Sequence, residues 1–200
     1  MTDATTRFQR LQQRYRDREM PWDHQLPPPE IMATAATLPP GRALDLGCGT
    51  ARAGVYLAAR GWMVDGVDFV PEAIALAEER VRSEGVADRV QLFTAPVTAL
   101  EFLQDPYDLV IDVGCMHGMP DDELVAYAAE VTRLTRPGGL YLLFAHLQER
   151  VEGEAPAWIA KGRVEILFAE GFSVERVEYG VTHVGESSWP SAWYWLRRNG

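Results

Sequence analysis

From residue 42 onward, short apolar segments alternate with amphipathic ones, and this alternation constrains the fold more than any other feature of the chain. The short apolar segments predict strands, and apolar residues at helical spacing between them predict helices. The predicted strands are residues 43–46, 63–67, 90–93, 108–111 and 140–144, and the predicted helices are residues 51–59, 71–81, 121–134 and 157–169. Short apolar strands separated by helices are typical of a parallel sheet that is covered on both faces.

The alternation of strands and helices stops near the C-terminus. Residues 172–179 and 192–197 have the pattern of two strands with no helix between them, which predicts an antiparallel hairpin at the edge of the sheet. We therefore predict the α/β class, with a Rossmann-like, doubly wound sheet of seven strands. The sheet is expected to be mostly parallel and to end in the antiparallel C-terminal hairpin.

Prolines divide the N-terminal part from this α/β core. Residues 27–29 and 39–40 are prolines, and proline breaks a helix and disfavours helix before it. The chain has 200 residues, which suits one domain with a sizeable core. We therefore expect a single domain, in which residues 1–41 form a helical cap over the site and residues 42–200 form the core.

Composition and charge exclude several classes of protein. The formal net charge is −10, so the surface repels phosphate backbones and a nucleic-acid partner is not expected. The only cysteines, Cys48 and Cys115, do not form a disulfide framework, which favours a reducing cytoplasm. No apolar run approaches the roughly 20 residues that cross a bilayer, and the N-terminus has no apolar signal segment, so no membrane partner is expected.

A glycine loop, Asp45-Leu46-Gly47-Cys48-Gly49-Thr50-Ala51, follows the first predicted strand and opens the first helix. Ligands of open parallel sheets bind at the carboxyl ends of strands, where this loop must lie. A dinucleotide site requires G-x-G-x-x-G or a final alanine. Counting from Gly47, the sixth position is Arg52, whose long side chain would obstruct tight packing near a pyrophosphate. The G-x-G-x-A spacing therefore argues against a nicotinamide site.

An acidic residue ends the second predicted strand. Asp68 closes the run Val64-Asp65-Gly66-Val67-Asp68, and a carboxylate there can accept hydrogen bonds from both hydroxyls of a ribose. Phe69, directly after it, is placed to pack on the edge of an adenine. The alternative is a surface aspartate that caps the helix beginning at Pro71. Loop and acid together favour ribose binding.

These residues resemble class I S-adenosylmethionine methyltransferases. Three further stretches resemble a narrower group of thiopurine, halide/thiol and tellurite-resistance methyltransferases; they are Pro21-Trp22-Asp23 with Leu26-Pro27-Pro28-Pro29-Glu30, Val55-Tyr56-Leu57-Ala58-Ala59-Arg60-Gly61, and Tyr107-Asp108-Leu109-Val110-Ile111-Asp112-Val113-Gly114. The resemblance implies S-adenosyl-L-methionine as the cofactor. It further implies a set of cofactor-binding residues, namely Trp22, Asp45, Gly47, Cys48, Gly49, Asp68, Phe69, Pro96, Val97 and Asp112.

Three members of this set have alternatives. Where the broad family often has an acid that contacts the adenine amino group, this chain reads Thr94-Ala95-Pro96-Val97, so backbone groups near Val97 or another loop are expected to serve adenine. Asp112 is expected to hold the amino-acid end of the cofactor through neighbouring backbone, or to cap the following turn. Trp22 is expected to cover the cofactor or to stack on its sulfonium, because a cation favours an aromatic face; the alternative is an apolar plug.

His117 and His146 are the candidate catalytic residues, because each follows a predicted strand on a loop at its carboxyl end. Either one could take a proton from the methyl acceptor; the alternative for each is an ordinary structural histidine. The segment 184–190, with Trp189, is expected to shape an acceptor pocket. No Cys/His cluster has the spacing of metal ligands, so no metal is expected.

The function we predict is transfer of a methyl group from S-adenosylmethionine to a small-molecule acceptor, with a thiol or another soft nucleophile favoured. An O- or N-methyltransferase of a secondary metabolite is the first alternative, and a non-catalytic S-adenosylmethionine-binding protein is the second. The oligomeric state stays open between monomer and homodimer.

Overall fold

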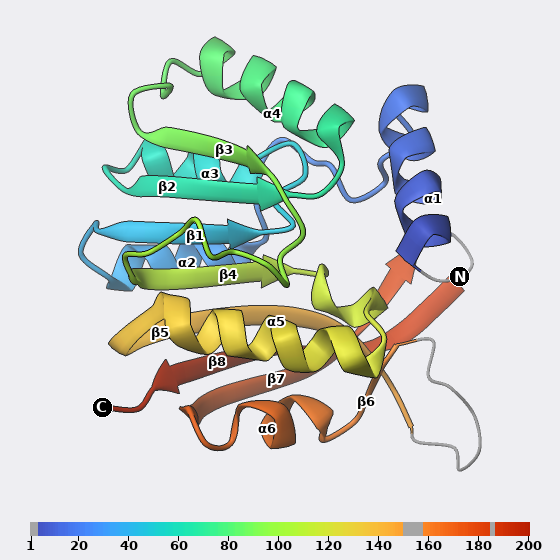
Figure 1. The fold of residues 1–200 in the computed structure, drawn as a ribbon, viewed down its shortest axis with the longest axis vertical. Helices are drawn as coiled ribbons and strands as arrows, with labels where there is room; N and C mark the ends of the chain where they lie inside the picture. The colour runs from blue at the N-terminus through green and yellow to red at the C-terminus, as the bar shows by residue number, and fades with distance from the viewer. Residues whose placement is uncertain (1–3, 150–157, 185–186) are drawn as a thin grey trace. The chain divides into compact units, whose positions relative to one another are not determined.

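In the computed structural model, which describes residues 4–149, 158–184 and 187–200, strands and helices alternate from Arg42 to Leu134 as predicted (Figure 1). The chain divides into two units, residues 1–100 and residues 101–200. None of the described helices is both long and apolar enough to cross a membrane.

The first unit holds three parallel strands in the order β3-β2-β1 and four helices. Its elements are α1 (Ala4–Asp17), α2 (Pro29–Thr37), β1 (Arg42–Leu46), α3 (Arg52–Ala58), β2 (Met63–Asp68), α4 (Pro71–Ser83) and β3 (Val90–Thr94). Leu44 and Leu46 of β1 are buried, as are Val64 and Val67 of β2. This burial is why these short runs form the interior of a sheet.

Gly66 lets the loop after β1 approach β2 closely. A Cβ at Gly66 would lie 2.9 Å from Cδ2 of Leu92 and 3.2 Å from Sγ of Cys48, so a larger residue would displace one of them. Strand β2 and the glycine loop are therefore in direct contact at this position.

Helix α1 packs on helix α4 through one apolar face (Figure 1). Phe8, Leu11 and Tyr15 recur at helical spacing and pack with Val70 and Ala73. Polar contacts flank this face: Gln12 and Arg16 of α1 both donate to the carboxylate of Glu72, at 3.1 Å and 2.7 Å. The N-terminal helix is thus fixed to the helix that follows Asp68.

The second unit has strands in the order β4-β5-β8-β7, and β6 pairs with the end of β5. Its elements are β4 (Tyr107–Val113), η1 (Met116–Gly118), α5 (Asp121–Leu134), β5 (Thr135–Gln148), β6 (Ile159–Ala160), α6 (Arg163–Phe168), β7 (Phe172–Val184) and β8 (Ser187–Arg198). Strands β4 and β5 are parallel, whereas β8 is antiparallel to both β5 and β7. The predicted α/β sheet with an antiparallel C-terminal hairpin is confirmed.

The strand count and the last helix differ from the predictions. There are eight strands among the described residues rather than seven, because Ile159 and Ala160 pair with β5 instead of being helical. The helix predicted for residues 157–169 begins only at Arg163, since Gly162 takes a left-handed conformation (φ 83°) immediately before it. Residue 157 of that prediction lies outside the described residues.

The C-terminal hairpin is longer than predicted. Strand β7 continues to Val184 and β8 begins at Ser187, so most of the segment expected to be a loop at 184–190 is strand. Residues 185 and 186 of that loop lie outside the described residues. Trp189 therefore projects from a strand paired with Thr182.

Candidate functional site

The glycine loop begins where β1 ends, and its backbone turns through the left-handed region three times. The φ angles are 67° at Gly47, 54° at Gly49 and 58° at Ala51. Such angles favour glycine, and alanine adopts them at a cost of about 1–2 kcal/mol. The amide of Cys48 donates to the carbonyl oxygen of Val67 at 3.0 Å, which holds the loop against β2.

Asp68 closes β2 and is hydrogen-bonded to the glycine loop. Its Oδ2 accepts from the backbone amide of Gly49 at 3.0 Å, and its Oδ1 accepts from the amide of Val70 at 2.9 Å. Burial raises the pKa of this carboxyl to about 6, although the two amides oppose the shift. The carboxylate is therefore ionised at neutral pH and still has free lone pairs. The alternative, a surface aspartate that caps α4, does not hold: Asp68 is buried, and α4 has no side-chain hydrogen bond at its N-cap, Val70.

The backbone carbonyl of Asp68 is hydrogen-bonded to the segment that follows β3. The backbone amide of Ala95 donates to the carbonyl oxygen of Asp68 at 3.1 Å. Pro96 is exposed and Val97 is buried immediately beyond this contact. Phe69 is partly buried and packs edge-to-face on Phe8 of α1, with 5.7 Å between ring centroids. The predicted adenine-contacting residues thus lie next to the predicted ribose carboxylate.

Aromatic residues of the N-terminal segment lie beside the loop. The hydroxyl oxygen of Tyr15 is 3.1 Å from the position that a Cβ of Gly49 would occupy. Trp22 lies edge-on to Tyr15 with 6.2 Å between centroids, and the guanidinium of Arg14 is 5.4 Å from the ring of Trp22. Burial raises the pKa of Tyr15 well above its usual range, so the phenol stays neutral. Tyr15 was not among the predicted site residues.

Asp23 ties three segments of the first unit together. Its Oδ1 accepts from the hydroxyl of Thr50 at 2.6 Å, and both of its oxygens accept from the guanidinium of Arg80, each at 3.0 Å. Thr50 belongs to the glycine loop and Arg80 to α4. A forked arginine–carboxylate pair is among the stronger charged contacts, so this carboxylate links the N-terminal segment to the loop.

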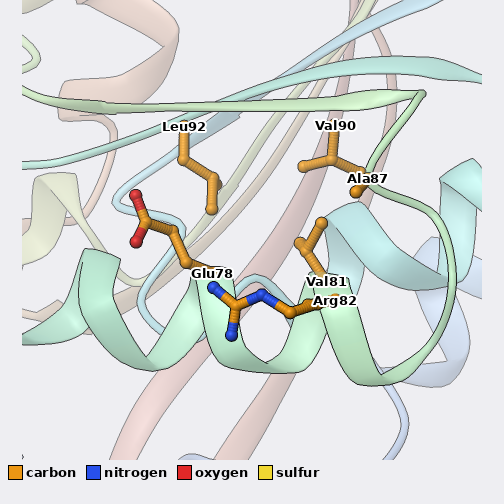
Figure 2. A pocket seen from close by; sticks show the side chains of 6 residues that line it. All are labelled: Glu78, Val81, Arg82, Ala87, Val90 and Leu92. Atoms are coloured by element: carbon orange, nitrogen blue, oxygen red, sulfur yellow. The ribbon is translucent and has the colours of Figure 1, made fainter.

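Two hollows border these elements in the first unit. The larger, about 690 Å³, includes Asp23, Thr50, Arg52 and Arg80 in its lining, and burial lowers the pKa of Arg52. The smaller, about 230 Å³, lies between α4 and β3; Figure 2 shows Glu78, Val81 and Arg82 on the helix facing Val90 and Leu92 of the strand. The smaller hollow contains no residue of the glycine loop.

Asp112 is the last residue but one of β4, and it caps the turn that follows the strand. Its carboxylate accepts from the amides of Cys115 at 2.6 Å and Met116 at 3.0 Å, and from the hydroxyl of Tyr127 at 2.6 Å. The side chain is completely buried, which raises its pKa to about 6. Of the two roles predicted for Asp112, the structure has the cap.

His117 and His146, from η1 and β5, are brought together. Their ring centroids are 4.5 Å apart, and the backbone amide of His146 donates to Nδ1 of His117 at 3.3 Å. Gly114 makes room for this arrangement, because a Cβ there would lie only 2.8 Å from Cε1 of His117. Gly114 has a φ of 89°, a conformation that glycine adopts readily.

Both imidazoles are neutral near pH 7. Burial, with a smaller contribution from His146, lowers the pKa of His117 to about 3. Burial also lowers the pKa of His146 below its ordinary value. Nδ1 of His146 is buried and has no hydrogen-bond partner within the described part of the chain.

Aromatic rings surround the two histidines. The centroid of Trp158 is 5.0 Å from that of each imidazole, and Trp189 is 5.6 Å from His146 and 5.9 Å from Trp158. Phe144 lies 5.3 Å from His146 on another side. We call these five residues the aromatic cluster. The sequence predicted Trp189 and the histidines, whereas Trp158 and Phe144 were missed.

Two further features of the described residues bear on chemistry. Cys48 is a buried thiol and Cys115 a partly buried one. Across residues 4–149, 158–184 and 187–200, no group of three or more histidine, cysteine or carboxylate side chains could hold a metal ion.

Comparison with known proteins shows what this chain is similar to. Residues 43–139 match the family described as a methyltransferase domain. Over these residues the chain is similar to methyltransferases.

Among curated proteins, the chain is 35% identical over 99 residues to the methyltransferase GfsG of Streptomyces halstedii, covering 49% of this chain and 35% of that protein. It is 31% identical over 124 residues to the 2-heptyl-1-hydroxyquinolin-4(1H)-one methyltransferase of Mycobacteroides abscessus, covering 62% of this chain and 54% of that protein. The chain thus spans about a third to a half of the length of these relatives.

Solved structures match over more of the chain. One solved structure is described by the words "Conversion of a Disulfide Bond into a Thioacetal Group during Echinomycin Biosynthesis". It matches with a TM-score of 0.78 and 25% identity, covering 96% of this chain and 93% of that one. The 1,6-didemethyltoxoflavin-N1-methyltransferase of Burkholderia thailandensis, solved with S-adenosylhomocysteine, has a TM-score of 0.74 and 20% identity, covering 98% and 89%. At 20% identity, the similarity to the toxoflavin-precursor methyltransferase is evidence for a shared fold alone.

Proposed function

We propose that this protein transfers a methyl group from S-adenosylmethionine to a small-molecule acceptor, with sulfur or another soft nucleophile as the favoured acceptor atom. The hydrogen bond between Gly49 and Asp68 carries the proposal. It joins the glycine loop to an ionised, buried carboxylate at the carboxyl end of the neighbouring strand.

The residues present fit the cofactor. Asp68 accepts hydrogen bonds from the backbone amides of Gly49, Val70 and Phe69, and its remaining lone pairs would accept from the ribose hydroxyls. Gly49 has no side chain, so the hydroxyl of Tyr15 approaches to 3.1 Å from the position that a Cβ would occupy. Phe69, Pro96 and Val97 would border the adenine.

The remaining cofactor contacts belong to the loop and the N-terminal segment. Asp45, Gly47 and Cys48 would shape the loop around the amino-acid end of the cofactor, and Trp22 would cover it. Asp112 is also in the predicted cofactor-binding set, and its carboxylate caps its own turn. When bound, S-adenosylmethionine supplies a methyl group on a positively charged sulfur, which is open to in-line displacement.

The acceptor would bind at the aromatic cluster. The cluster lies after β4 and near the end of β5, and ligands of parallel sheets bind at carboxyl ends of strands. The aromatic cluster is expected to favour an uncharged acceptor, because a charge of either sign would lose its hydration there. The net charge of −10 opposes an RNA acceptor.

The names of the relatives support a small acceptor without agreeing on its reacting atom. One is named for a hydroxyquinolone and another for a nitrogen of a toxoflavin precursor. The structure with the highest TM-score quoted above is named for sulfur chemistry. An O- or N-methyltransferase is accordingly the second candidate function.

Two measurements test the proposal. Calorimetry with S-adenosylhomocysteine and with NAD should give binding of the former alone; binding of NAD alone would contradict the cofactor assignment. Methylation assays across thiols, phenols and amines should then give turnover. Tight binding of S-adenosylhomocysteine with no turnover on the whole panel would favour a non-catalytic binding protein, and turnover of phenols with inert thiols would remove sulfur as the preference.

A further inference from the structure

The larger hollow of the first unit is bounded by three segments. Helices α3 and α4 form two of its sides, and the segment that joins α1 to α2 forms the third. Thr50 is the single residue of the glycine loop in its lining, and Asp68 does not line it. Its volume of about 690 Å³ lies within the usual range for ligand sites, roughly 300–1,000 Å³. The hollow is therefore large enough for a small molecule and is separate from the surface around Asp68.

Arg52 is a half-buried cation in this lining, and it forms no hydrogen bond or ion pair with the residues that the structure describes. Burial lowers the pKa of its guanidinium, although the nearby charges of Asp45 and Asp23 oppose the shift. A cation that has lost water without gaining a hydrogen bond is costly. A guanidinium presents five N–H donors in a planar fork that matches a carboxylate. A carboxylate in the hollow would therefore satisfy Arg52.

The other charged groups of the hollow determine the charge of the ligand that it suits. The lining contains three more arginines and three carboxylates, namely Arg18, Arg60, Arg80, Asp23, Glu79 and Glu84. Arg80 and Asp23 neutralise each other through their fork. Three guanidiniums then face two carboxylates, which leaves one net positive charge with His24 counted as neutral. This balance favours a monoanion, because further negative charge would be repelled by the two glutamates.

Apolar side chains form much of the remaining wall. Met20, Val55 and Leu76 contribute one from each of the three segments. Leu26 lines the hollow as well, and 58% of its surface is exposed to water. Removing such surface from water is favourable in proportion to its area. A ligand that fills the hollow should therefore have a hydrocarbon body beside its anionic group.

We propose that this hollow is a binding site for an organic monocarboxylate with an apolar body, whose carboxylate pairs with Arg52 and whose body lies on the apolar wall. This site goes beyond the proposed function. S-adenosylmethionine also carries a carboxylate, but its ribose partner Asp68 lies outside the lining, so the cofactor is not the ligand of this hollow.

A series of straight-chain carboxylates tests both parts of the ligand by calorimetry. Octanoate should bind the wild-type protein, and Kd should fall about twofold to fourfold for each CH₂ from butyrate to octanoate. Octanamide has the same body without the charge, and it should bind at least about tenfold more weakly than octanoate. Equal Kd values for octanoate and octanamide, or no binding of octanoate, would overturn the proposal.

Arg52→Gln tests the pairing with the carboxylate. We expect this variant to raise the Kd for octanoate by about tenfold, as for loss of a hydrogen bond to a charged group. The matched control is Arg82→Gln, because Arg82 is an arginine of α4 that lines the smaller hollow (Figure 2). The control should change Kd by less than about twofold. Equal losses in the two variants would mean that octanoate responds to overall charge and not to this site.

Gln25→Glu places a negative charge in the hollow without changing the size of the side chain. Gln25 lines the hollow and is exposed, so this variant should fold even if Arg52→Gln does not. The added charge should raise the Kd for octanoate by about threefold to tenfold. Gln9→Glu adds the same charge at an exposed position of α1 outside the lining and should have no such effect. An unchanged Kd in Gln25→Glu would place octanoate elsewhere and overturn the proposal.

S-adenosylhomocysteine shows whether the two sites are distinct. At saturation it should change the Kd for octanoate by less than about threefold, below the usual size of coupling between sites. Competitive displacement of octanoate would locate it in the cofactor site and overturn the proposal. Failure of S-adenosylhomocysteine to bind wild-type protein, while octanoate still binds, would contradict the proposed function alone.

Discussion

The backbone amide of Gly49 donates a hydrogen bond to Oδ2 of Asp68 over 3.0 Å, so the glycine loop and the acidic end of β2 form one structural unit. Replacing Asp68 with asparagine leaves the shape but removes one acceptor oxygen and the charge. We expect the Kd for S-adenosylhomocysteine, measured by calorimetry, to rise by about tenfold to a hundredfold.

Asp65→Asn is the control for Asp68→Asn. Asp65 lies on the same strand, β2, and is the register partner of Leu44 in β1. Its carboxylate forms an ion pair with the guanidinium of Arg42 at 3.3 Å. This ion pair is partly buried, and we expect its loss to change the affinity for S-adenosylhomocysteine by less than about twofold. Similar losses in the two variants would mean that Asp68 does not contact the ribose.

The raised pKa of Asp68 predicts a pH dependence of cofactor binding. Burial places this pKa near 6, so the carboxylate is lost as pH falls through about 6. Affinity for S-adenosylhomocysteine should be constant from pH 8 to pH 7 and weaken between pH 6.5 and pH 5. The Asp68→Asn variant should have a flat profile; an equally steep profile there would assign the effect to another group.

The lowered pKa of His117 predicts a pH dependence of stability. The folded state resists a proton down to about pH 3, whereas the unfolded chain takes one near the ordinary pKa of 6.5. Stability from this group is therefore present above pH 6.5 and lost as pH falls toward 3, with a ceiling of about 1.4 kcal/mol per pH unit.

His117→Gln isolates that contribution, because the buried carboxylates Asp68 and Asp112 have the opposite trend: their raised pKa values make the folded state bind protons more readily than the unfolded chain. Denaturant unfolding at pH 7 and pH 5 should show the variant gaining stability relative to wild type on acidification. A difference that does not change with pH would contradict the prediction.

Gly114 tests whether the orientation of His117 depends on a missing side chain. Gly114→Ala places a methyl group 2.8 Å from the imidazole and strains a backbone φ of 89°. Gly138→Ala has the strain alone, since φ is 73° and nothing lies within 4 Å of the added carbon. Thermal or denaturant unfolding should give a loss of about 1–2 kcal/mol for Gly138→Ala and about 1–3 kcal/mol more for Gly114→Ala.

Asp23 should couple cofactor affinity to the N-terminal segment. Asp23→Asn weakens the fork to Arg80 and the contact to Thr50, both partly buried, so we expect the dissociation rate of S-adenosylhomocysteine to rise about threefold to thirtyfold. Glu72→Gln, which removes the exposed pairing with Arg16, should have less than about a twofold effect. Equal dissociation rates of S-adenosylhomocysteine in wild type and Asp23→Asn would show that this coupling does not exist.

Local patterns were sufficient to predict the α/β core. Strands β1 to β4 were predicted to within two residues at each end, because short apolar runs mark them, whereas β5 begins five residues before the predicted strand and ends four residues after it. The segment around Ile159 was missed because two residues pair with β5 through backbone contacts that no periodicity encodes. Gly162 was the available signal that the last helix begins late.

The candidate site was predictable only where it is local in sequence. Gly49 and Asp68 could be found from spacing, since the loop and the next strand end follow each other along the chain. Tyr15 and Trp158 could not, because each reaches its neighbours through packing of distant segments. The packing of Phe8, Leu11 and Tyr15 against the start of α4 was not predicted either.

The carboxylate of Asp23 has a consequence for thermodynamic linkage. A ligand that orders Thr50 must, through Asp23, also stabilise the docked state of the N-terminal segment. By linkage, docking of the segment must raise the affinity for that ligand by the same factor. Amide hydrogens of α1 should then exchange more slowly when S-adenosylhomocysteine is bound. Helix α1, although it lies before the methyltransferase core in sequence, would report the occupancy of the cofactor loop.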